Sequence, residues 1–312
     1  MSSIMRRYIL RAAGVLVICG IYAFIFRQIS FDFSEVRSSE VEVALLPVLY
    51  AVSLIFLSFL FRCLAWDVTF RKFGHMLPLL RTARILAISN LGRYVPGKVA
   101  TVGGVLFLAS KEGIPPRVSG TALFINLVVP LLTAAFIFAL SLIFLDLQFS
   151  FGSALWVLGG LILVASTACL QPPLFNRLSA FLYRKVRGGE FDCKLSYSFL
   201  YQNTLFILIG WAAQGLAFFF LSRAFFEIPF ASLPFFIGGN AIAFMLGLIS
   251  VFAPAGLGVK EGVLYLALTQ CLPAAQVAVL VLVWRIFTTV VELVLAGGFF
   301  LCGFWRVSAE KA

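Results

Sequence analysis

Two polar segments give the strongest indication of the architecture: Leu91-Gly-Arg-Tyr-Val-Pro-Gly-Lys98 and its counterpart Phe252-Ala-Pro-Ala-Gly-Leu-Gly-Val-Lys-Glu-Gly262. Each combines Pro, Gly and charged residues, and each interrupts an apolar neighbourhood, one in each half of the chain. A bilayer tolerates irregular backbone only where protein or water satisfies its polar groups. The two segments are therefore predicted to be breaks that line a cavity inside a membrane protein. The residues that break the backbone are Pro96, Gly97, Pro254, Gly256 and Gly258.

The composition predicts an all-α integral membrane protein with several spans. Of the 312 residues, 62% are hydrophobic and 12% are charged, against about 25% charged in a typical soluble domain. Since a span needs about 20 apolar residues, about eight transmembrane helices are expected in a single domain covering residues 1–312. The long apolar runs fall near residues 8–26, 43–61, 119–145, 151–171, 199–221, 234–253 and 276–304, with shorter ones near 85–92, 99–109 and 262–272.

The charge pattern predicts the orientation and explains the net charge of +11 without nucleic acid. Residues 62–84 and 172–198 are rich in Arg and Lys, whereas residues 27–42 are rich in Asp and Glu. The positive-inside rule makes the basic stretches cytoplasmic loops and the acidic stretch an external loop. Both termini are then cytoplasmic. Seven full spans do not allow this, so an interrupted run has to cross or the last long run has to split.

The first break is predicted to be a re-entrant hairpin. Around residues 85–110 two short apolar arms flank the break, both ends are basic, and neither arm is long enough to cross. A similar pattern surrounds the second break. Paired broken segments in corresponding halves are typical of transporters built from inverted repeats, whose sites lie near the middle of the membrane. An inverted repeat is therefore a hypothesis for this chain.

Each break carries charged residues suited to an anion. Arg93, Tyr94 and Lys98 combine a planar guanidinium, a hydroxyl and a point charge, which together suit a phosphate headgroup. The alternative is an ordinary surface loop whose cations meet bulk lipid. In the second break, Lys260 and Glu261 either neutralise one another, pair with the other break, or exchange a proton. The alternative there is a tight turn with a solvated ion pair.

A further cation and carboxylate lie in the last apolar run. Arg285 and Glu292 are seven residues apart, so they project from one helix face two turns apart. Charges embedded in an apolar run usually face the interior of the bundle or a water-filled cavity. Glu261 and Glu292 are interpreted as charge-balancing or proton-coupling residues. The alternative is a structural pair, with Glu292 bonded to Arg93 or Lys260.

Several kinds of chemistry find no support in the sequence. No Walker loop for ATP is present, and the only histidine is His75, which leaves little for a zinc site or a Ser-His-Asp triad. The six cysteines form no Cys-x-x-Cys pair. We therefore expect no metal, no cofactor, no catalytic residues and no enzymatic activity. An intramembrane transferase that uses Glu261 or Glu292 as a base is a minor alternative.

Three stretches resemble the transmembrane, flippase-like domain of lysylphosphatidylglycerol synthases, and the similarity covers nearly the whole chain. They are Leu91 to Lys98 with Lys111-Glu112-Gly113, Ala253 to Gly262, and Arg285 with Thr288, Thr289 and Glu292. The family often has Gly where Ala255 stands and Arg where Lys260 stands, and both changes are mild. The larger synthases carry a soluble aminoacyl-transfer domain after the membrane part, which this chain, ending at Ala312, is expected to lack.

The resemblance implies a lipid translocase of the cytoplasmic (inner) membrane rather than a lysyltransferase. Its ligands would be membrane lipids with anionic headgroups, bound by Arg93, Tyr94, Lys98, Lys260 and Arg285. The alternative is an accessory membrane protein that does not transport and that docks a lipid-modifying enzyme.

Overall fold

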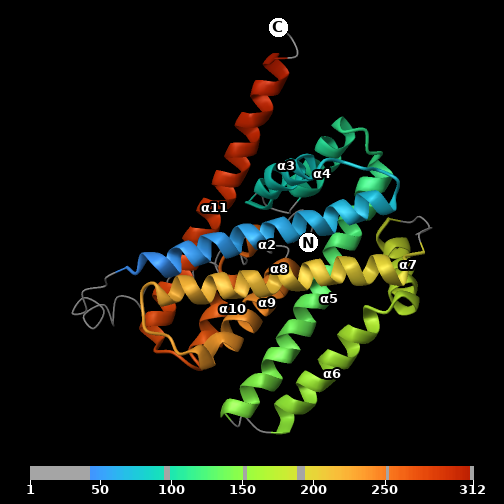
Figure 1. Ribbon diagram of the computed structural model, residues 1–312. Helices are drawn as coiled ribbons and strands as arrows, with labels where there is room; N and C mark the ends of the chain where they lie inside the picture. The colour runs from blue at the N-terminus through green and yellow to red at the C-terminus, as the bar shows by residue number, and fades with distance from the viewer. Residues whose placement is uncertain (1–42, 95–98, 150–152, 188–193, 251–252, 310–312) are drawn as a thin grey trace, which may run out of the picture.

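The protein is a bundle of long helices crossed by two short helical hairpins, as the computed structural model shows (Figure 1). The structure describes residues 43–94, 99–149, 153–187, 194–250 and 253–309, and this part of the chain contains no strand. The predicted all-α membrane fold is confirmed. Five helices are long and apolar enough to cross a membrane. They are α2 (Leu45–Lys72), α5 (Pro116–Phe149), α8 (Tyr197–Arg223), α9 (Leu233–Ile249, extended by the turn η2, Phe230–Ser232) and α11 (Ala274–Ala309).

Helices α2 and α8 pack along their whole length in opposite directions (Figure 1). The Ala44 backbone N–H donates to the Ala224 carbonyl at 3.0 Å, which joins the start of α2 to the end of α8. Nearer the other end, the fully buried Asn203 amide of α8 donates to the Ala65 carbonyl at 2.8 Å and to the Thr69 hydroxyl oxygen at 3.1 Å. These bonds fix the register of the pair at the level where α5 also contacts it.

The first break is a helical hairpin, as predicted. Helix α3 (Leu79–Asn90) continues into a 3-10 turn, η1 (Leu91–Tyr94), and α4 (Val99–Lys111) packs back against α3. At 12 and 13 residues, neither arm is long enough to span. A Cβ atom on Gly92 would collide with the backbone of Ala100, so only glycine allows the first turn of α4 to approach η1 so closely.

The second break is also a hairpin, built on a run of left-handed backbone. After α9 the chain forms the turn η3 (Pro254–Gly256), and then α10 (Val259–Leu268) packs against α9. The φ angles are +53° at Ala255, +72° at Gly256 and +79° at Gly258. Only glycine adopts such angles at little cost, which explains why the sequence is glycine-rich here. Ala255 is the exception and stores some backbone strain.

A bent helix pair follows α5. Helix α6 (Ser153–Cys169) and α7 (Pro172–Arg187) meet at an angle of 84°. The start of α8 holds α7 in place, because the Asn176 amide exchanges two 3.1 Å bonds with the backbone of Leu195. The Tyr201 hydroxyl also donates to the Gln171 side chain at 2.8 Å.

The expected count of about eight spans is not confirmed. The described residues contain five spans, or six if α6 and α7 form one broken span. Helix α11 is continuous, so the last run does not split, and α3, α4 and α10 are too short to cross. The expected first span at 8–26 and the acidic loop at 27–42 lie outside the described residues. The inverted repeat stays a prediction.

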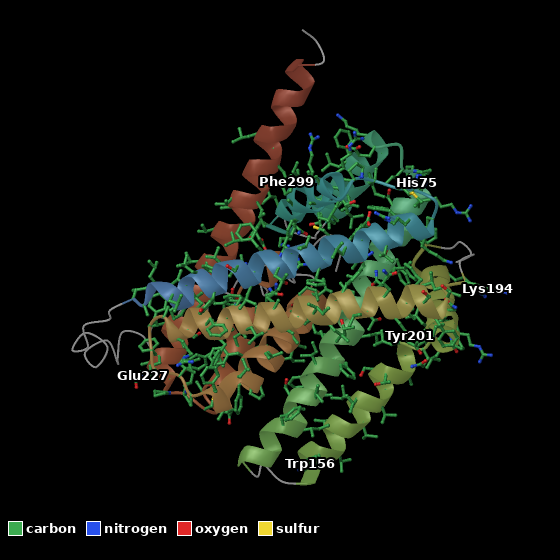
Figure 2. The ribbon with its side chains drawn as sticks, viewed as in Figure 1. His75, Trp156, Lys194, Tyr201, Glu227 and Phe299 are labelled. Carbon is green, nitrogen blue, oxygen red and sulfur yellow. The ribbon has the colours of Figure 1, made fainter. Side chains whose placement is uncertain are left out.

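The two basic stretches are also more helical than expected. Residues 62–84 are not a loop, because α2 continues to Lys72 and α3 begins at Leu79. Residues 172–198 contain α7. Both stretches nevertheless meet at one end of the α2–α8 pair, where His75 and Lys194 lie, far from Glu227 at the other end (Figure 2).

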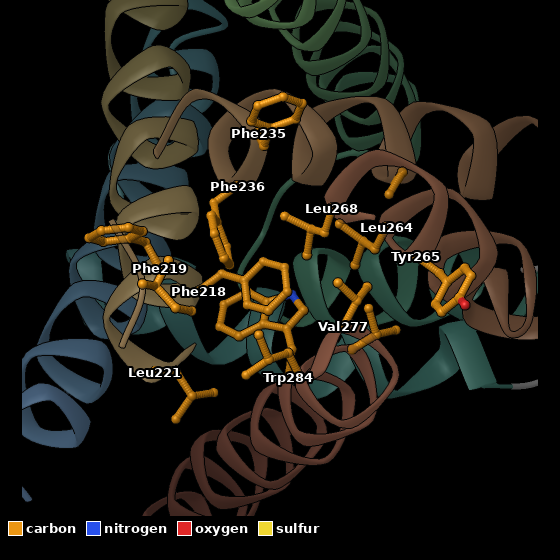
Figure 3. Close-up of a cluster of buried hydrophobic side chains, with 14 of the residues drawn as sticks. Phe218, Phe219, Leu221, Phe235, Phe236, Leu264, Tyr265, Leu268, Val277 and Trp284 are labelled. Atoms are coloured by element: carbon orange, nitrogen blue, oxygen red, sulfur yellow. The ribbon is translucent and has the colours of Figure 1, made fainter. Parts of the chain in front are cut away.

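An apolar cluster holds the second hairpin against the start of α11 (Figure 3). Trp284 of α11 stacks on Phe218 of α8, with ring centroids 4.7 Å apart, and Phe236 of α9 meets the same ring edge-on at 5.0 Å. Leu264 and Leu268 of α10 face this cluster. Glu261 lies on α10 one turn before Leu264, and Arg285 follows Trp284 on α11. The packing of the cluster therefore holds Glu261 and Arg285 on adjoining helices.

Candidate functional site

The two breaks lie against each other, and α11 contacts the first of them. The turns η1 and η3 are in contact, and α11 packs against η1 and α3. Segments about 160 residues apart in the sequence therefore form one polar region among apolar helices. The predicted juxtaposition of the two broken segments is found in the structure.

Glu292 of α11 binds the first break through two side chains. The Arg93 guanidinium Nη1 lies 2.9 Å from Glu292 Oε1, and the Tyr94 hydroxyl donates to Oε2 at 2.9 Å. Arg93 Nε donates to the Asn90 carbonyl at 3.1 Å, which orients the guanidinium plane. The side chains of Arg93 and Glu292 are 23% and 26% exposed, so a polar ligand can reach the pair.

Arg285 of α11 binds the second break, and here α11 supplies the cation and the break supplies the carboxylate. Its Nε lies 3.3 Å from Glu261 Oε1, and the Glu261 side chain is only 2% exposed. Neither carboxylate oxygen of Glu261 has a hydrogen-bond partner among the described residues, and Arg285 Nη2 has none either. This pair neutralises charge without satisfying its hydrogen-bonding groups, whereas the Arg93–Glu292 pair does both.

Lys260 lies in a slot made by two glycines. A Cβ on Gly247 would fall 2.6 Å from Lys260 Cγ, and one on Gly256 would fall 3.0 Å from its Cε. The ammonium lies 5.6 Å from the centre of the Phe244 ring, and within electrostatic range of Arg93, Arg285, Glu261 and Glu292. Within the described part of the chain, no carboxylate lies within 4 Å of it.

A small cavity adjoins Glu292, and its lining includes no residue of the second break. Its volume is about 50 Å³. Helices α2, α3, α8 and α11 enclose it. Its polar lining residues are Ser58, Arg62, Asn90, Gln214, Thr288 and Glu292, and its apolar lining residues are Ile55, Phe59, Ala87, Val291 and Leu295.

Arg62 is a site residue that the sequence reasoning missed. It stands at the end of the apolar run 43–61 and was assigned to a basic loop, but it lies within α2 and points its charge toward this cavity. The charges of Arg93 and Glu292 both act on it. One signal could have identified it, because the helical pattern continues without Gly or Pro through Lys72 and places Arg62 well inside the helix.

The structure brings together six of the predicted site residues, and three others lie outside the described part of the chain. Arg93, Tyr94, Lys260, Glu261, Arg285 and Glu292 surround the junction of the two breaks. Pro96, Gly97 and Lys98 lie outside the described residues. Pro254, Gly256 and Gly258 form the turn of the second break. The described residues contain no group of three or more His, Cys, Asp or Glu that could hold a metal ion.

The site lies within a recognised membrane domain. The family model for the lysylphosphatidylglycerol synthase TM region matches residues 11–296. The chain belongs to this family. Both breaks, Arg62 and the charged part of α11 fall inside the matched region of this lysylphosphatidylglycerol synthase TM-region protein. No curated protein matches the chain. Membership of the family indicates a multi-pass membrane protein of lipid biosynthesis or translocation.

Proposed function

We propose that the protein is a lipid translocase of the cytoplasmic membrane, which moves the headgroup of an anionic phospholipid or phosphate-linked glycolipid between leaflets. The observation that carries this proposal is the charge of the site. The four cations Arg62, Arg93, Lys260 and Arg285 face two carboxylates, Glu261 and Glu292, so two positive charges remain for an anionic ligand.

The energetic reason for such a site is the desolvation of the headgroup. Moving an ion of carboxylate or ammonium size into a medium of low dielectric constant costs of the order of 20 kcal/mol in the idealised limit. Fixed cations offset this penalty for a phosphate, and broken helices supply backbone N–H groups that favour anions. The acyl chains would remain in the surrounding lipid while the headgroup crosses through protein.

The Arg93–Glu292 pair supplies an exchange step for the headgroup. A phosphate oxygen would replace Glu292 Oε1 at the Arg93 guanidinium, so one charge-assisted bond is exchanged for another. Glu292 would keep its 2.9 Å bond from Tyr94, and would therefore not be left without a partner. Arg285 and Lys260 would attract the headgroup toward the second break. This exchange is transport without chemical change, so we propose no enzymatic activity and no cofactor.

The test is leaflet exchange of labelled lipids in liposomes that contain the pure protein. Anionic phospholipids and polyprenyl-phosphate lipids are the substrates, and Arg93→Gln is the variant. Arg81→Gln is the matched control, because Arg81 also pairs with a glutamate at 2.9 Å but lies 52% exposed at the surface. We expect exchange above that of empty liposomes, at least tenfold lower in Arg93→Gln and unchanged in Arg81→Gln.

The opposite result favours a different role. If folded protein exchanges none of these lipids, the translocase proposal fails. The basic end of the bundle would then be tested as a docking surface for a lipid-modifying enzyme, by capture of a stoichiometric partner that still binds after Arg93→Gln.

A further inference from the structure

The cavity beside Glu292 contains a cation, Arg62, that forms no ion pair within 4 Å in the described part of the chain. Within the described residues, Arg62 donates no hydrogen bond and lies within 4 Å of no acidic side chain. Arg93 and Arg285, by contrast, are already paired with Glu292 and Glu261. A cation enclosed by apolar helices is costly unless it is paired. Arg62 is therefore the guanidinium of this cavity that is free to receive an anion in this conformation.

The depth of Arg62 suits a transported group. Ten residues separate Arg62 from Lys72 at the basic end of α2, and 17 separate it from Leu45 at the other end. At 1.5 Å per residue, Arg62 lies about 15 Å along the helix from the basic end. The hydrocarbon core of a bilayer is about 30 Å thick, and the 28 residues of α2 are more than enough to cross it, so the cavity lies within the span and not at either end of the helix.

The size and the lining of the cavity define the chemical class of its ligand. One enclosed water needs about 10–15 Å³ by the same measure, so a volume of about 50 Å³ admits about three to five groups of that size. A phosphate with its four oxygens has about this size, and because the cavity is partly open the rest of a lipid can remain outside it. The Gln214 amide on α8 adds both donors and an acceptor opposite Arg62 and, in the described structure, forms no hydrogen bond to another side chain.

We propose that this cavity is the receiving site for the phosphate group of the lipid, with Arg62 as its cationic ligand and Gln214 as its neutral one. Glu292 forms the wall between the cavity and Arg93, so a phosphate bound at Arg62 stands next to the carboxylate that it would displace. The headgroup is held first at Arg62 and then reaches Arg93 and the two breaks. This assignment rests on the proposed function, but binding alone can test it.

The experiment measures binding of dihexanoyl phosphatidic acid, a water-soluble lipid with a bare phosphate headgroup, to the purified full chain in detergent by calorimetry. A charge-assisted bond contributes enough that Arg62→Gln should weaken binding about 10- to 100-fold. Arg62→Lys keeps the charge and should bind within a few-fold of the unaltered protein. Gln214→Leu should weaken binding several-fold. Lys72→Gln is the matched control on the same helix, because Lys72 is exposed at its end, and it should bind normally.

The outcomes separate this site from the transport proposal. Unchanged binding by Arg62→Gln, from folded protein, overturns the assignment even if the protein exchanges lipids. Binding that depends on Arg62 and is found for inorganic phosphate, but not for the lipid, overturns the lipid as the source of the phosphate. Binding of the lipid that depends on Arg62, in a protein that exchanges no lipid, supports the site and refutes transport.

Discussion

Replacing Arg285 by Met should destabilise the protein by about 3–5 kcal/mol, which is the usual penalty for breaking a buried ion pair from one side. The structure gives the same scale, because two unit charges 3.3 Å apart at an effective dielectric constant of about 20 attract by about 5 kcal/mol. Water cannot compensate for the loss, since the Glu261 side chain is 2% exposed. The pair also holds α11 beside the second break, so its loss should loosen that contact.

The measurement is the free energy of unfolding in mixed micelles, followed by tryptophan fluorescence. Arg81→Met is the control, because its pair with Glu112 is exposed and should contribute at most about 1 kcal/mol. The double variant Arg285→Met with Glu261→Gln should recover most of the loss, since neutral replacements of a buried pair are often tolerated. If Arg285→Met costs no more than Arg81→Met, the pair does not hold α11 to the second break.

The same double variant separates a structural role from a transport role. Its stability is restored, but Arg285 is absent from the site. We therefore expect it to fold and to exchange lipid at least tenfold more slowly than the unaltered protein. Normal exchange by the folded double variant would remove Arg285 from the substrate-binding residues and leave it as a structural cation.

Three further predictions concern stability and the Lys260 slot. Asn203→Leu should lower the free energy of unfolding in mixed micelles by about 1–2 kcal/mol. The variant loses two hydrogen bonds to α2, each of a kind that averages about 0.6 kcal/mol in membranes, and leaves their acceptors buried. No loss of stability would mean that those bonds do not form. Gly247→Ala should lower lipid exchange to the level of Lys260→Ala, since its Cβ would fall 2.6 Å from the Lys260 side chain. Gly239→Ala should exchange normally, since its Cβ would lie 3.3 Å from Ala267 and 3.7 Å from Leu264 and would not reach Lys260. Ala255→Gly should raise the unfolding free energy by about 0.5 kcal/mol, as relief of the left-handed strain exceeds the entropy cost of glycine; a loss of stability would show that the strain is not present.

The breaks and the helices around them could be predicted from local sequence. Pro and Gly within apolar runs indicate where helices end, and the length of each arm shows that neither crosses the membrane. Arg285 and Glu292 were predicted because a charge in an apolar run needs a polar environment. Arg93, Tyr94 and Glu261 were predicted because they lie in the two breaks. Their meeting at the junction of η1, η3 and α11 is observed in the structure.

The pairing of the charges could not be predicted from the sequence. Glu292 pairs with Arg93, which lies nearly 200 residues away in the chain. Arg285 pairs with Glu261 and not with Glu292 on its own helix. These choices follow from how α11 packs on α3 and α10, which no local pattern specifies. Arg62 was missed because a cation at the end of an apolar run was taken to end the span, although the absence of Gly and Pro up to Lys72 indicates that the helix continues.

The depth of Arg62 also bears on the direction of transport. Arg62 lies about 15 Å along α2 from Lys72 and about 25 Å from Leu45, so the cavity is inside the span and not at either end. A phosphate bound inside the span could leave toward either leaflet, so binding at Arg62 does not by itself set a direction. Net flow would then follow the difference in lipid concentration between leaflets, and it would reverse when that difference is reversed. A supply of newly made lipid on one side, or its removal on the other, would be sufficient to set the direction.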